Sequence, residues 1–233
     1  MLATGPSPFA WPILVGLTST FVPLVAAAVT RRSPRDDAGA QVAVGWAVLG
    51  VLNLVALAQF LQVVPRSLPV VSLSAPLSLL CFTPPLLSWI GRGSARHRWW
   101  IAIVATAVMC AAGMAVLGVD REFRLVTVPA VGAVLTVLSV TALATMLWRR
   151  AGQPWRADWF WILLGMTVYF VVGIVWKPLT EFLVARSWAA LVDLHMGMML
   201  LHGGTYCLMA WGLLRPRTPR AQSRQFQPAP EAA

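Results

Sequence analysis

Long apolar stretches alternate with short polar connectors along most of the 233-residue chain. A helix needs about 20 apolar residues to cross the ~30 Å hydrocarbon core of a bilayer. Seven stretches reach this length, at residues 9–30, 41–64, 69–90, 99–119, 125–148, 159–176 and 188–214. The pattern predicts an all-α fold, a polytopic membrane helix bundle with seven transmembrane helices that form one domain over residues 1–214.

Basic residues are distributed unequally over the two sides of these seven spans. The connectors after the odd-numbered spans, together with the C-terminal tail, hold thirteen Arg, whereas the connectors after the even-numbered spans hold four Arg and one Lys. Cytoplasmic connectors carry the excess of basic residues, so the chain is predicted to be N-out/C-in and a multi-pass protein of the cell membrane. Residues 215–233 are rich in Arg and Pro and have too little apolar surface to fold, which predicts a disordered cytoplasmic tail.

The composition restricts the class of protein further. Hydrophobic residues make up 58% of the chain and charged residues only 11%, where soluble proteins carry roughly a quarter charged residues. A cytosolic enzyme, a secreted disulfide scaffold and a disordered protein are therefore excluded. The net charge is +10, but the Arg lie in short clusters between apolar runs, so the expected partner is the lipid bilayer and not nucleic acid. Three cysteines lie inside the spans and are expected to be small buried side chains without a disulfide: Cys81, Cys110 and Cys207.

Ionisable groups inside the last span are the first candidates for function, because such groups are costly in a bilayer. Asp193, His195 and His202 lie within residues 188–214. One face of this span carries imidazole, thioether and phenol side chains at helical spacing: His195, Met198, Met199, His202 and Tyr206. Three glycines of the same span are expected to let a neighbouring backbone approach closely: Gly197, Gly203 and Gly204.

The other carboxylates lie at span ends or in connectors. Asp158 begins the sixth span, where it is expected to cap the helix. Glu181 follows Lys177 by four residues, so the two form an ion pair if this connector is helical. Five acids lie in loops or in the tail and are set aside as candidates: Asp36, Asp37, Asp120, Glu122 and Glu231.

Polar residues of other spans lie at depths that match the histidines. Asn53 and Gln59 are on the second span and Tyr169 is on the sixth. These positions predict a polar-lined pocket in the outer half of the membrane, walled by spans one, two, three, six and seven. Ser and Thr in these spans are explained by hydrogen bonds between helices, whereas an acid with two His on one helix favours a functional site.

The last span resembles the final helix of a known family. The segment that runs from His202-Gly-Gly-Thr-Tyr206 through Trp211 to Arg215 is similar to that of the small integral-membrane terpene cyclases of meroterpenoid and indole-diterpene pathways. Those proteins end in an Asp-Gly-x-Tyr pattern followed by aromatic residues and Arg, and they share the length, the seven spans and the short loops. The Asn53 region also resembles their Asn-x-x-x-Glu helix.

The resemblance implies a metal-independent enzyme without a cofactor, of isomerase or lyase type, which cyclises an apolar, prenylated or polyprenyl lipid. The family's proton donors are an acid on the second span and the Asp that opens the last-helix motif; here Leu57 and His202 occupy those positions. Asp193, Glu181 or a protonated His202 is then the expected catalytic acid. The expected substrate-binding residues are His195, Asn53, Gln59, Tyr169 and Tyr206.

Two other functions fit the same span. The His and Met stripe suits Cu(I), which prefers soft ligands, so a membrane transporter or a copper-handling protein is the alternative hypothesis. A structural subunit whose polar residues meet the helices of a partner is the third. A retinal protein is excluded, because the single lysine, Lys177, lies at the outer end of the sixth span and not inside the last one.

Overall fold

The computed structural model describes residues 18–35, 37–60, 70–91, 94–117, 121–149, 153–184 and 188–216. Within these ranges the chain is all-helical, with seven α-helices, one 3-10 turn and no strand. The elements are α2 (Val22–Val29), α3 (Ala38–Phe60), α4 (Val70–Ile90), α5 (Ser94–Leu117), α6 (Arg121–Arg149), η1 (Pro154–Arg156), α7 (Asp158–Val184) and α8 (Trp188–Leu214). The predicted all-α fold class is confirmed for the described residues.

Four of these helices are long and apolar enough to cross a membrane. The apolar windows lie in α3, α4, α6 and α7 at Ala38–Gln59, Leu73–Ile90, Thr127–Arg149 and Asp158–Val175, and α5 adds a shorter apolar helix at His97–Cys110. Between 33% and 44% of each long window is buried inside the protein. The remaining apolar surface needs an apolar environment, so the chain is a helical membrane protein.

Several helices extend beyond the predicted spans, and α7 and α6 show it clearly. α7 continues past residue 176 to Val184, so Lys177 and Glu181 lie four residues apart on a helix and not in an irregular connector. α6 is 29 residues long and begins at Arg121. Polar residues are tolerated near the ends of a membrane helix, which is why the apolar run alone underestimates the length of both helices.

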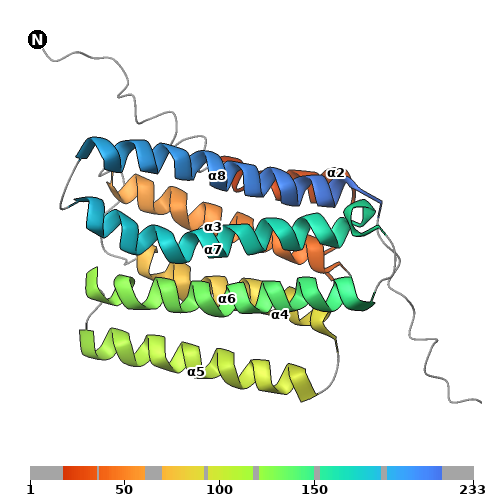
Figure 1. The fold of residues 1–233 in the computed structure, drawn as a ribbon, viewed down its shortest axis with the longest axis horizontal. Helices are drawn as coiled ribbons and strands as arrows, with labels where there is room; N and C mark the ends of the chain where they lie inside the picture. Colours follow the sequence, from red (N-terminus) through yellow and green to blue (C-terminus); the bar gives the residue numbers. More distant parts are fainter. Residues whose placement is uncertain are drawn as a thin grey trace, which may run out of the picture.

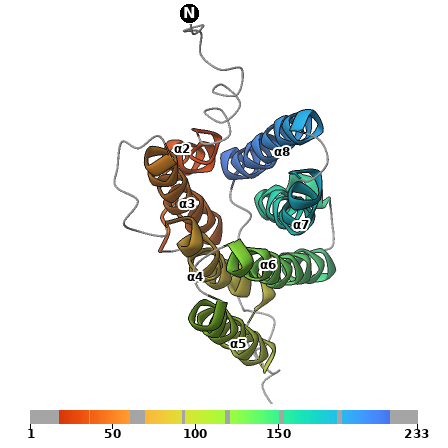
Figure 2. The same cartoon turned by 90° about the vertical axis from the view of Figure 1, so that its left-hand side faces the viewer.

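Six helices form a closed ring around one core. Neighbours in the ring are α2 and α3, α3 and α4, α4 and α6, α6 and α7, α7 and α8, and finally α8 and α2. α5 lies outside the ring, against α4 and α6 (Figures 1 and 2). The fully buried side chains inside the ring include Trp46, Phe82, Leu135, Met166 and Met209.

Trp46 on α3 is the centre of this core. Its ring centroid lies 4.6 Å from that of Phe82 and 4.4 Å from that of Tyr169. Its Nε1 donates a hydrogen bond to the sulfur of Met209 at 3.1 Å. Because these partners come from α4, α7 and α8, one side chain joins four helices of the ring.

Close approach of backbones occurs at Gly165 and Gly212, where α7 and α8 meet. A Cβ at Gly165 would lie 2.9 Å from the carbonyl oxygen of Thr205, and one at Gly212 would lie 2.7 Å from that of Asp158. Small residues of this kind let membrane helices pack tightly. The sequence-based assignment of this role to three other glycines of α8 is not supported by the described part of the chain, where a Cβ at any of them would meet nothing within 4 Å: Gly197, Gly203 and Gly204.

A buried arginine links three segments at one end of the ring. The side chain of Arg32 is 2% exposed, and its Nη1 donates to the carboxylates of Asp37 at 3.0 Å and Asp158 at 2.8 Å. Its Nη2 donates to the carbonyl oxygen of Arg215 at 2.6 Å. The connector between α2 and α3, the start of α7 and the end of α8 are thereby joined. We refer to Arg32, Asp37, Asp158 and Arg215 as the Arg32 cluster.

Asp37 lies in the connector before α3, as expected, but its side chain has a structural role there. Besides binding Arg32, its Oδ1 accepts hydrogen bonds from the backbone N–H groups of Gly39 at 2.7 Å and Ala40 at 3.3 Å. These contacts make Asp37 the N-cap of α3.

The expected burial of the cysteines holds in part, since Cys110 is buried whereas Cys207 is exposed.

Candidate functional site

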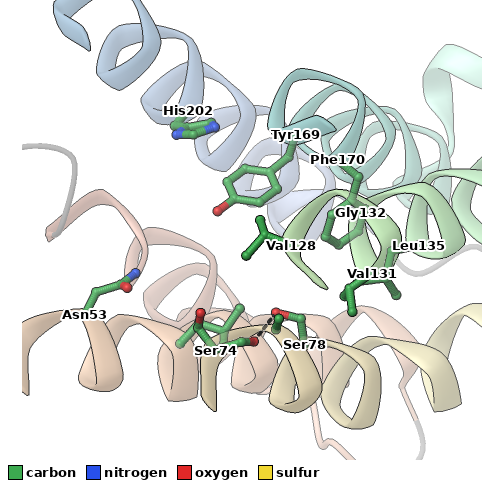
Figure 3. A pocket seen from close by; sticks show the side chains of 13 residues that line it. Asn53, Ser74, Ser78, Val128, Val131, Gly132, Leu135, Tyr169, Phe170 and His202 are labelled. Carbon is green, nitrogen blue, oxygen red and sulfur yellow. Dashed lines mark hydrogen bonds between the residues drawn. The ribbon is translucent and has the colours of Figure 1, made fainter. Parts of the chain in front are cut away.

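A half-open cavity of about 210 Å³ lies among five helices of the ring (Figure 3). α3, α4, α6, α7 and α8 all contribute to it. The lining residues are Leu49, Asn53, Ser74, Ala75, Ser78, Val128, Val131, Gly132, Leu135, Tyr169, Phe170, Gly173 and His202.

The cavity lies on the side of the Trp46–Met209 contact that faces away from the Arg32 cluster. Asn53 follows Trp46 by seven residues on α3, and His202 precedes Met209 by seven residues on α8. Seven residues are about two helical turns, or ~10 Å. Since α3 leads away from the Arg32 cluster and α8 leads back to it, Asn53 and His202 lie at a similar level of the bundle.

The two sides of the cavity differ in chemistry. The residues of α6 are apolar and present Val128, Val131 and Leu135. Across from them, α3, α4, α7 and α8 present amide, hydroxyl, phenol and imidazole groups, and the phenol oxygen of Tyr169 points into the space between (Figure 3). The cavity is therefore amphipathic, with a polar side that holds no carboxylate among its described residues and an apolar side.

Aromatic rings form the polar side nearest the core. The ring of His202 lies 4.5 Å from that of Tyr169, with 33° between the ring planes. Tyr169 in turn contacts Trp46 at 4.4 Å and Phe170 at 5.6 Å. His202 is thus held against an aromatic cluster that the buried core fixes in place.

The hydroxyls of α4 are partly engaged within their own helix. Ser78 donates its hydroxyl to the carbonyl oxygen of Ser74 at 2.6 Å (Figure 3). This contact is local back-bonding, which is common for Ser in membrane helices. The bond lies within α4, so for Ser78 the structure shows a hydrogen bond inside one helix and not the expected one between helices.

Three of the predicted site residues meet at the cavity: Asn53, Tyr169 and His202. Tyr206 is buried behind Tyr169, at 5.7 Å between ring centroids, and Gln59 is buried further along α3. The side chains of Asp193, His195 and Glu181 lie outside the described residues. Among the described lining residues none is a carboxylate, so the imidazole of His202 is the strongest acid or base that they supply.

The apolar side of the cavity was missed by the sequence analysis. The pocket was expected between spans one, two, three, six and seven, but the described lining includes the fifth span through α6 and does not include the described part of the first. Gly132 on α6 and Gly173 on α7 are the sequence signals that could have pointed to it, since glycine in a helix interior needs a reason outside the helix.

Comparison with known proteins gives no match, since no protein-family model, no curated protein and no solved structure matches the chain. The residues of the cavity therefore have to indicate its function directly.

Proposed function

We propose that the chain is a metal-independent membrane enzyme that binds an uncharged, prenyl-type lipid in this cavity and starts its cyclisation by protonation. The observation that carries the proposal is the amphipathic cavity in which His202 lies against Tyr169. An apolar chain with one neutral polar group complements the two sides of such a cavity.

The size of the cavity limits what enters it. An apolar cavity of about 150 Å³ holds benzene, so about 210 Å³ holds roughly eight non-hydrogen atoms by the same ratio. This is enough for the reacting end of a prenyl chain. Because the cavity is half-open, the rest of the chain extends through the opening.

The proposed reaction needs a proton donor, a shaped apolar wall and aromatic faces. A protonated imidazole at His202 gives its proton to an epoxide oxygen or to an alkene carbon of the substrate. The epoxide C–O bond breaks, or the alkene electron pair takes the proton, and a carbocation results. The electrons of the next alkene close the ring, and loss of a proton back to the imidazole ends the sequence without any oxidant.

Aromatic rings stabilise a cation over their faces by about 0.5–2 kcal/mol each. Tyr169 and Phe170 both line the cavity and are packed against Trp46. We assign them the role of stabilising the travelling carbocation. Asp193 and Glu181 remain the alternative proton donors.

Seven membrane crossings with an N-out/C-in orientation form part of the proposal. The Arg32 cluster brings the connector before α3, the start of α7 and the end of α8 to one end of the bundle. Gly91 after α4 lies against Arg149 at the end of α6. The connectors with the most Arg thus gather at one end, as the positive-inside rule requires of the cytoplasmic side. Reporter fusions at the C-terminus test this orientation, and an extracytoplasmic reporter signal would contradict it.

The catalytic proposal is tested with purified protein in mild detergent and an epoxidised prenyl phenol. We expect a product of unchanged mass and altered retention in chromatography coupled to mass spectrometry. His202→Phe keeps a ring in place but removes the proton donor, and it should lower turnover by a factor on the order of 10²–10⁴, as for a lost general acid. Cys207→Ser is the matched control, because Cys207 is exposed on the same helix.

Variants of the two other acids separate the possible donors. If Asp193→Asn or Glu181→Gln abolishes turnover while His202→Phe retains it, the donor is that carboxylate and the role of His202 is wrong. If all three variants turn over at the wild-type rate, proton-initiated cyclisation in this cavity is refuted. Absence of turnover in the wild-type chain with epoxidised prenyl phenols of several chain lengths would also contradict the proposal.

A further inference from the structure

We propose that Gly173 sets the size of the apolar group that the cavity accepts. The inference rests on the proposed function for the identity of the substrate, but it rests on the cavity alone for the role of the residue. Gly173 lines the cavity from α7, one turn after Tyr169 and Phe170.

The surroundings of Gly173 differ from those of the packing glycines. A Cβ at Gly165 or at Gly212 would meet backbone oxygen within 3 Å, so helix contact explains both of these glycines. A Cβ at Gly173 would meet none of the described atoms within 4 Å. Helix packing therefore does not require a glycine at this position, and the space it leaves belongs to the cavity.

Gly132, the other glycine of the lining, is less open. A Cβ there would lie 3.2 Å from Cγ1 of Ile174. A side chain at position 132 would thus press on α7, whereas a side chain at position 173 would enter free space. Gly173 is the position where bulk is added without moving a helix.

The cavity volume shows how much of the space a side chain at position 173 would fill. The cavity holds roughly eight non-hydrogen atoms, and a leucine side chain contains four carbon atoms. Leucine at position 173 would take about half of the space, whereas alanine would take about one eighth. We expect Gly173→Leu to exclude ligands that Gly173→Ala still admits, and to shift the preference toward smaller apolar groups.

The test uses the full chain in membranes and two photoreactive probes. Adamantyl diazirine is a compact apolar probe, and a diazirine analogue of farnesol is a prenyl alcohol. After illumination, cross-links on the peptides that contain Val128, Tyr169 and His202 are quantified by mass spectrometry. We expect at least tenfold less labelling of these peptides in Gly173→Leu, and a smaller loss in Gly173→Ala.

Gly204→Leu is the matched control. Gly204 lies on α8, a Cβ there would also meet nothing within 4 Å, and the residue is exposed outside the cavity. This variant should be labelled like the wild type. If Gly173→Leu fails to accumulate in the membrane, Gly173→Ala and Gly173→Val provide the graded series, and labelling that does not fall with side-chain volume overturns the inference.

The two probes separate this inference from the proposed function. If adamantyl diazirine labels the wild type and Gly173→Leu equally, the role of Gly173 is overturned whatever the substrate is. If Gly173→Leu suppresses labelling by adamantyl diazirine while the farnesol analogue never labels the cavity, the role of Gly173 stands and the prenyl substrate class fails. Suppression with both probes supports both.

Discussion

Replacement of Arg32 by alanine should be among the most destabilising single changes in the bundle. Its side chain is 2% exposed and donates three hydrogen bonds, to two carboxylates and one carbonyl oxygen. Removal of one partner from a buried ion pair costs about 3–5 kcal/mol, because the other charge is left without compensation. The buried carboxylate that loses its ion pair with Arg32 here is chiefly Asp158, whose side chain is only 12% exposed.

The other contacts of Asp37 keep the loss of stability in Arg32→Ala within this range. Its carboxylate keeps the two hydrogen bonds from backbone N–H groups at the start of α3 when Arg32 is absent. We therefore expect Arg32→Ala to lower the free energy of unfolding by about 3–5 kcal/mol. Addition of Asp158→Asn should recover part of this loss, because the double variant no longer buries the carboxylate that Arg32 paired with. The free energy of unfolding of Arg32→Lys should lie between those of the wild type and Arg32→Ala, since a lysine keeps the positive charge but cannot present a planar fork to several acceptors.

The assay is reversible unfolding by denaturing detergent in mixed micelles, followed by circular dichroism. Arg35→Ala is the matched control, because Arg35 is exposed in the same connector and exposed charges contribute about 1 kcal/mol or less. A loss below about 1 kcal/mol for Arg32→Ala, comparable to that of an exposed ion pair, would refute the reasoning. So would a double variant that is less stable than Arg32→Ala itself.

Two further predictions concern the backbone, and thermal unfolding in mild detergent measures both. Gly165→Ala and Gly212→Ala should each lower stability by about 1–3 kcal/mol, because the new methyl group overlaps a carbonyl oxygen of the neighbouring helix. Gly204→Ala should raise stability by up to about 1 kcal/mol through helix propensity. Equal effects at all three sites would contradict the roles assigned to these glycines. Arg31 has a φ of 51° after the end of α2, a conformation that costs a non-glycine residue about 1–2 kcal/mol. Arg31→Gly should therefore raise the unfolding temperature. A lower unfolding temperature would show that the contribution of the arginine side chain outweighs the strain.

The helices could be predicted from the sequence because a bilayer imposes a length. Each apolar run of about 20 residues contains a helix in its described part. The buried pairing of Arg32 could not be predicted in the same way. A count of arginines for orientation treats them all as solvated, and nothing in the local sequence distinguishes Arg32, which is buried, from Arg31 and Arg35, which are exposed.

The polar half of the cavity was predictable and the apolar half was not. Asn53, Tyr169 and His202 are unusual inside apolar spans, so their depth alone indicated that they meet. Val128, Val131 and Leu135 look like any other residues of a membrane helix. Lipid tails are as apolar as a protein core, so hydrophobicity does not reveal which face of α6 points inward.

The two ends of the bundle have different roles, since one stabilises the fold and the other contains the cavity. The end that contains the Arg32 cluster is fixed by a capped helix, a buried cation and the contact of α7 with α8 at Gly212. The cavity lies about two turns beyond the Trp46–Met209 contact, where Gly173 leaves space and polar side chains line that space. A ligand with an apolar body and one neutral polar group complements the two sides of this cavity. Variants of the Arg32 cluster should therefore change unfolding with little effect on ligand selectivity, and Gly173 variants should do the reverse.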